Sequence, residues 1–113
     1  MRKTDKKVDN KLRLVLTDVC ETALKEINGF QWLTHLVNYS NFPQSLKVVC
    51  VFDTNDHLAT FIASSNKNLF TSLIESKLNE IDIKLKNVAA QLLYDTEENC
   101  AKFHNGNWAN RLG

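Results

Sequence analysis

The chain has 113 residues, of which 43% are hydrophobic, and its 14 Lys and Arg against 13 Asp and Glu leave a formal net charge of +1. This composition is ordinary for one globular domain and excludes the low-complexity and transmembrane classes, because no apolar run approaches the ~20 residues that a membrane span needs. The first residues have no apolar stretch of the secretory kind, and three widely spaced cysteines fit reduced thiols. We therefore predict a single cytoplasmic domain over residues 1–113, with no membrane partner.

The first predicted element is an amphipathic helix over about residues 8–27, preceded by a basic flexible arm at residues 1–7. Gly29 is free to take the left-handed conformation that ends such a helix. The helix is the strongest periodic signal in the chain, because its apolar residues recur three and four positions apart. They are Val8, Leu12, Val15, Leu16, Val19, Cys20, Ala23, Leu24 and Ile27.

Two strands are predicted next. Residues 31–37 fit a strand or a short helix, and their strand-forming composition favours the strand. Turn-forming residues 38–45 follow, and then residues 46–52 form an apolar, β-branched run that is the clearest strand in the chain. We expect these two strands to pair as an antiparallel hairpin.

The second half of the chain predicts helix and then strand. Residues 53–56 offer N-cap candidates for a helical region over residues 58–81, which the Ser64-Ser65-Asn66 stretch divides into two helices or one broken helix. Residues 88–94 read as a third strand, and residues 101–113 as an irregular polar tail. The expected fold is α+β, with the order α-β-β-α-(α)-β and a three-stranded sheet that carries its helices on one face.

Basic residues concentrate at the start of the chain, where residues 1–13 hold six bases against two acids. A basic segment on a slightly acidic body indicates a polyanionic partner such as RNA or DNA, although the same residues can simply solvate the end of a chain. The candidate nucleic-acid contacts are Arg2, Lys3, Lys6, Lys7, Lys11, Arg13, Lys84 and Lys86.

Two predicted strands end alike, in Phe52-Asp53-Thr54 and Tyr94-Asp95-Thr96. If those strands are parallel, Asp53 and Asp95 leave the sheet at the same edge, where carboxylates can hold Mg²⁺. The alternative is that both Asp residues cap or turn the chain, and this alternative is the one we favour. We therefore predict no cofactor and no resident metal.

The tail gathers amides, an indole and a guanidinium in Asn105, Asn107, Trp108 and Arg111. These groups can stack on and hydrogen-bond a ligand, or they can fill a gap in the core and make turns. No nucleophile elbow, phosphate-binding loop or dinucleotide fingerprint is present, and the histidines and cysteines do not show zinc-site spacing. We expect no catalysis; a magnesium-dependent enzyme ranks third, behind a nucleic-acid or ribonucleoprotein binder and a protein–protein adaptor or homodimer.

Residues 1–10, 29–39, 46–54 and 95–100 resemble a family of short, uncharacterised gammaproteobacterial proteins often labelled Fis-family transcriptional regulators. The resemblance spans nearly the whole chain and implies a regulatory DNA-binding role. The order of elements over residues 8–96 also resembles the KH-like fold of the ribosome-binding factor A family, with the helix break at residues 63–66. That second resemblance implies a partner that is RNA or a ribonucleoprotein.

Overall fold

In the computed structural model, which describes residues 3–113, the longest element is α1 (Lys3–Glu26). Its buried residues Leu12, Leu16 and Val19 form the predicted apolar stripe. The helix begins five residues earlier than expected, so residues 3–7 are helical and not a flexible arm. It ends before Gly29, whose φ of +87° and close approach to His57 leave no room for a Cβ atom.

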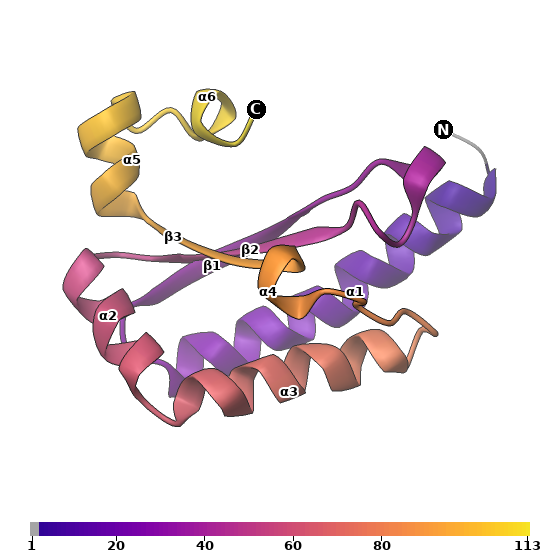
Figure 1. The fold of residues 1–113 in the computed structure, drawn as a ribbon, viewed down its shortest axis with the longest axis horizontal. Coiled ribbons are helices and arrows are strands. Elements are labelled where there is room, and N and C mark those ends of the chain that lie inside the picture. The colour runs from indigo at the N-terminus through magenta and orange to yellow at the C-terminus, as the bar shows by residue number, and fades with distance from the viewer. Residues whose placement is uncertain (1–2) are drawn as a thin grey trace.

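Three strands form one mixed sheet in the order β1-β2-β3 (Figure 1). The strand β1 (Phe30–Leu36) pairs antiparallel with β2 (Lys47–Phe52), across a loop that contains the short 3₁₀ helix η1 (Tyr39–Asn41). The predicted hairpin is therefore confirmed, and the ambiguous first segment is a strand. The strand β3 (Leu92–Thr96) pairs parallel with β2.

Two helices in series, α2 (Asn55–Ala63) and α3 (Asn66–Asn79), connect β2 to the next segment, as expected. The break falls at Ser64, whose backbone N–H and hydroxyl both donate to the carbonyl of Phe61. Ser, Thr and Asn side chains compete for backbone groups in this way, which explains why the serine pair interrupts the helical region.

The third strand is shorter than predicted, because residues 88–91 form the helical turn α4 (Val88–Gln91). Asn87 caps this turn by accepting from the N–H of Ala90, and the Gln91 amide donates to the carbonyls of Pro43 and Leu46. The pairing of β2 with β3 begins at Val48 and Leu92, and β2 itself begins at Lys47. A third strand that began at residue 88 would therefore have no partner for its first residues.

The C-terminal residues form two helices, α5 (Glu97–His104) and α6 (Trp108–Leu112), where the sequence predicted an irregular tail. Asparagine chemistry explains the correction. Asn105 adopts a left-handed conformation at φ 51° that ends α5, and the Asn107 side chain caps α6. Figure 1 shows α5 and α6 on one side of the sheet, with α1 and α3 on the other.

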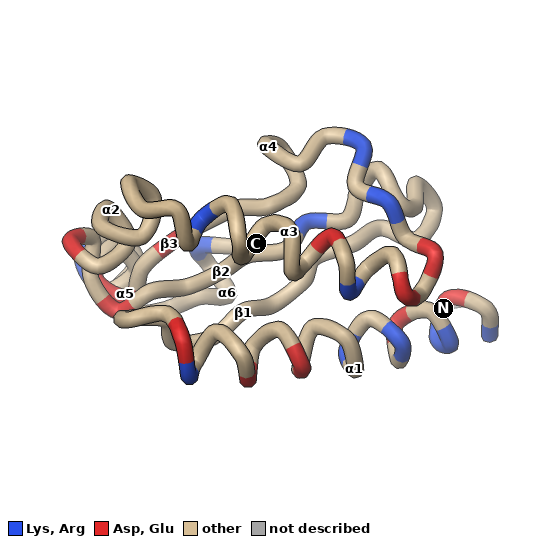
Figure 2. The backbone as a smooth tube through the Cα atoms, turned by 90° about the horizontal axis from the view of Figure 1, so that it is seen from below, with Lys and Arg blue, Asp and Glu red and all other residues tan. Residues whose placement is uncertain are grey.

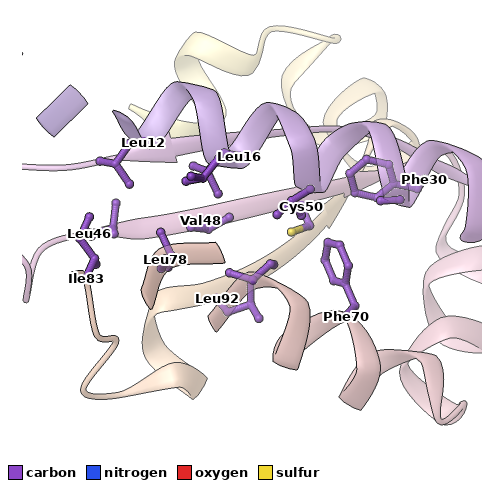
Figure 3. Packing of buried hydrophobic residues seen from close by; sticks show 14 of the residues in the cluster. Leu12, Leu16, Phe30, Leu46, Val48, Cys50, Phe70, Leu78, Ile83 and Leu92 are labelled. Atoms are coloured by element: carbon purple, nitrogen blue, oxygen red, sulfur yellow. The ribbon is translucent and has the colours of Figure 1, made fainter. Parts of the chain in front are cut away.

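The main core lies between the sheet and the α1–α3 pair (Figure 3). Alternate residues of β2 point into it, and Val48, Cys50 and Phe52 are fully buried there. The side chains of four phenylalanines each pack against two of the others, with ring centroids 5.0–6.0 Å apart; they are Phe30, Phe52, Phe61 and Phe70. The predicted α+β fold with a three-stranded sheet is confirmed; helices were expected on one face, and α5 and α6 add a second helical layer on the other face.

Candidate functional site

The predicted basic residues lie at one end of the molecule. Five of them, Lys3, Lys6, Lys7, Lys11 and Arg13, are exposed along the first turns of α1, and Lys84 and Lys86 are exposed in the segment between α3 and α4. Arg2 lies outside the described residues. Figures 1 and 2 both place the start of α1 and the 84–86 segment at the same end, which we call the basic end.

The basic end also contains acidic groups, so its charge is positive but not uniform (Figure 2). The described part of α1 up to Arg13 holds five bases and two acids, a local +3. Asp82 precedes Lys84 in the chain, and Glu80 lies 3.6 Å from the Nζ of Lys77. The side chains therefore offer a moderate positive field of the kind that attracts an extended polyanion.

One buried carboxylate organises the inner side of the basic end. Asp9 accepts from the Tyr39 hydroxyl at 2.8 Å, its Oδ1 lies 3.1 Å from His35 Nε2, and its Oδ2 lies 3.0 Å from Arg13 Nε. Hydrogen bonds from His35 and Tyr39 hold the pKa of Asp9 below its usual value. Burial, reinforced by Asp9, raises the pKa of Tyr39 to about 12.

The Asp9 cluster, formed by Asp9, Arg13, His35 and Tyr39, was not predicted from the sequence. Asp9 and Arg13 are four residues apart on a predicted helix, which is a visible pairing signal. His35 and Tyr39, however, lie 26 and 30 residues further along the chain, and only the packing of α1 beside β1 brings them to Asp9. The cluster holds the Nε of Arg13 and links α1 to the β1–η1 segment.

The two Asp-Thr pairs leave the parallel strands at the same sheet edge, as expected, and each makes the same local structure. The backbone N–H groups of Thr54 and Thr96 donate to Asp53 and Asp95, at 2.6 and 2.8 Å. The Thr54 and Thr96 hydroxyls then cap the following helices, α2 and α5.

Each of these carboxylates also contacts a nitrogen-bearing side chain. His57 Nδ1 lies 2.7 Å from Asp53 and holds the pKa of that carboxyl below its usual range. Arg111 donates two hydrogen bonds to Asp95, at 2.6 and 2.9 Å. Among residues 3–113, no three His, Cys, Asp or Glu side chains are grouped to hold a metal ion. Asp53 and Asp95 each hold the backbone N–H of the threonine that follows, and that threonine is the N-cap.

The tail residues that the sequence singled out are held against the sheet. Trp108 meets Trp32 edge to face, with ring centroids 4.9 Å apart. Both indole N–H groups donate to Glu97, that of Trp32 at 2.7 Å and that of Trp108 at 3.2 Å. One carboxylate therefore bridges two residues that are far apart in the sequence. Arg111 also donates to His104 Nδ1 at 3.2 Å.

This arrangement leaves α6 poorly suited to read DNA bases. A helix-turn-helix protein inserts its second helix in the major groove and uses side chains near its N-terminus. Here α6 has five residues, and the guanidinium of Arg111 is engaged by Asp95. Asn105 and Asn107, which were candidates for ligand contacts, end α5 and begin α6.

The thiols are placed for packing. Cys50 and Cys100 are buried and Cys20 is half-buried, and burial raises the pKa of both buried thiols. A thiolate nucleophile is therefore disfavoured at Cys50 and Cys100. Over residues 3–113, no helix combines the length and the apolar character that crossing a bilayer demands.

Comparison with protein-family models, with curated proteins and with solved structures produced no match to this chain. Both resemblances drawn from the sequence therefore stay predictions.

Proposed function

We propose that this protein is a non-catalytic module that binds nucleic acid through its basic end. The observation that carries the proposal is the convergence of two separate groups of bases. The first turns of α1 and the 84–86 segment are about 70 residues apart in the chain, yet both lie at one end of the molecule (Figure 2). Lys and Arg side chains that share a surface contact successive phosphates.

Charge separation along the molecule supports the same surface. Asp53 follows the last residue of β2, Asp95 is the penultimate residue of β3 and Glu97 begins α5, so these carboxylates lie near α2 and α5 and away from the start of α1 (Figure 1). Asp95 is paired with Arg111, whereas among the described residues no Lys or Arg pairs with Asp53 or Glu97, so this end attracts a nucleic acid less than the basic end does.

The helix break at Ser64 is not the surface we propose. It lies beside α2, at the opposite end of the molecule from the start of α1 (Figure 1). The nearest basic residue in sequence is Lys67 alone. Phosphate contacts supply the salt-dependent part of nucleic-acid affinity, so the surface with most bases is the stronger candidate.

The test is fluorescence anisotropy with labelled single-stranded RNA and double-stranded DNA, measured at several salt concentrations. Binding is expected at low salt, and the log of affinity is expected to fall linearly with the log of salt concentration. The double variant Lys7→Gln with Lys11→Gln should reduce that salt slope by about 2, because each phosphate-contacting base contributes about 1.

The matched control is Lys25→Gln with Lys102→Gln, which removes the same charge at the other end of the molecule. This control should leave the salt slope unchanged. The proposal is overturned if neither probe changes anisotropy at micromolar protein and low salt, or if both double variants weaken binding equally. Preference for RNA over DNA, or the reverse, assigns the kind of nucleic acid.

A further inference from the structure

The strand β1 has an open outer edge. It lies at the end of the strand order β1-β2-β3, and it pairs with β2 alone within the described sheet. Its pairing register is regular from Trp32 to Leu36, and the one irregularity lies at its start, between Phe30 and Trp32. The strand contains no Pro, Lys, Asp or Glu, the residues that commonly protect an edge from further pairing.

A groove of about 590 Å³ runs between this edge and α1. Its size lies within the range of sites that hold small ligands or short peptide segments. Leu16, Cys20 and Leu33 supply apolar surface, and Thr17 and Thr34 lie on opposite walls. The groove therefore combines a hydrophobic surface with the unpaired N–H and C=O groups of a strand edge.

Opposite charges stand on the helical wall of the groove. Arg13 and Glu21 both line it, two turns apart on α1. The Arg13 side chain is 71% exposed, and among described residues its charge is paired with Asp9 through Nε alone, which leaves the terminal amino groups to face solvent. Eight helical residues span about 12 Å, which matches about four residues of extended chain.

We propose that this groove binds an extended peptide that adds to the sheet antiparallel to β1. An acidic residue would face Arg13, an apolar residue two positions later would contact Leu16 and Cys20, and a basic residue four positions later would face Glu21. Residues i, i+2 and i+4 of a strand share one face, so a single strand presents all three groups to α1.

The direction of the peptide follows from the direction of α1. Contact between Asp9 and His35 places the early part of α1 beside the late part of β1, so the two elements run antiparallel. Arg13 therefore lies nearer the C-terminal end of β1 than Glu21 does. A peptide antiparallel to β1 begins at that end, which puts its acidic residue before its basic residue.

A single strand fits this groove better than the same edge of a second copy. Figure 2 shows α1 along the β1 side of the sheet, with α3 beside it on the same face, toward β3. A second molecule that paired its own β1 here would bring its α1 against the first α1 on the same face. A free peptide has no such helix to place.

The test uses the acetylated and amidated nonapeptide Ser-Thr-Glu-Val-Leu-Val-Lys-Thr-Ser and its charge-swapped partner, in which Glu and Lys exchange places. Titration into the ¹⁵N-labelled full chain should shift the amide signals of β1 and of the groove-facing residues of α1. The charge-swapped peptide should bind roughly three- to tenfold more weakly, because both exposed ion pairs are replaced by repulsion.

The decisive variant is Arg13→Glu combined with Glu21→Arg, which should reverse the preference between the two peptides. Lys11→Glu combined with Asp18→Arg makes the same charge changes away from the groove and should preserve the original preference. The inference is overturned if no shifts map to β1, if the preference does not reverse, or if sedimentation shows a dimer through this edge. Nucleic-acid binding is measured separately, with the Lys7/Lys11 variant and its Lys25/Lys102 control, so the two proposals fail independently.

Discussion

The two faces of the sheet are covered in different ways. On one face, α1 and α3 bury an apolar core in which Ile74, Leu78 and Val48 are fully excluded from solvent. On the other face, α5 and α6 are held by directional contacts, chiefly the two indoles on Glu97 and the paired hydrogen bonds of Arg111 to Asp95.

One small domain can therefore contain layers of unequal stability. Apolar burial contributes roughly in proportion to area and is shared by many side chains. A layer fixed by a few polar and aromatic contacts has less to lose before it opens, and such segments open locally below the global unfolding free energy. We expect the α5–α6 layer to open first.

The largest effect is expected from the core face. Ile74→Ala removes a fully buried side chain and leaves a cavity, which should lower the free energy of unfolding by about 2–5 kcal/mol. Urea denaturation followed by far-UV circular dichroism measures the change. Leu69→Ala, on the same helix but 66% exposed, is the control and should change stability by less than about 0.5 kcal/mol.

A smaller effect is expected on the opposite face. Trp108→Ala removes the edge-to-face contact with Trp32 and one of the two hydrogen bonds to Glu97, at a cost of about 2 kcal/mol because the indole is only half-buried. When this variant is titrated with urea, its near-UV circular dichroism signal should be lost at a lower urea concentration than its far-UV signal. Phe103→Ala, at a 62% exposed site on α5, should leave both signals intact. Equal loss of both signals would show that the two layers unfold together.

Thiol reactivity compares the two layers directly. Cys50 lies in the α1–α3 core and Cys100 lies in α5, and both are buried. If the α5–α6 layer opens locally, Cys100 should react with a thiol reagent about tenfold faster than Cys50 under native conditions. Half-buried Cys20 should react before either. Single-cysteine variants followed by mass spectrometry give the three rates, and identical rates for Cys50 and Cys100 would contradict the comparison.

The smallest effect concerns Asp9, whose carboxylate is buried on the α1 side. The folded-state pKa of Asp9 is lowered, so its contribution to stability is complete above the ordinary Asp pKa of about 3.9 and is lost as pH falls through the lower folded value. Asp9→Asn should reduce stability at pH 7 by about 1 kcal/mol. In urea melts between about pH 5 and pH 2, the free energy of unfolding of the variant should fall less steeply than that of the unmodified protein. An unchanged slope would exclude Asp9 as a source of the pH dependence.

The sequence predicted the core face well because its signals are local and repeated. Helical spacing from Leu12 to Ala23 and the apolar run of β2 each draw on many residues, so no single exception hides the pattern. The break at Ser64 was also visible, since small hydroxyl residues compete locally for backbone groups.

The candidate sites were less accessible to prediction. The bases on α1 and at Lys84 and Lys86 could be named from the sequence, but their convergence at one end could not. The groove beside β1 had no sequence signal, because its walls come from Arg13, Glu21 and Leu33, and only the packing of α1 along a strand edge creates it.

Local chemistry thus determined the elements, their caps and the apolar faces, down to the Asp-Thr pairs that end β2 and β3. The contact of Asp53 with His57 is local as well, since the two residues are four positions apart, whereas the contact of Asp95 with Arg111 of α6 depends on the tertiary structure. The physical reason is that caps and periodic faces are made within a few residues, while an ion pair between distant residues depends on where the whole chain places them.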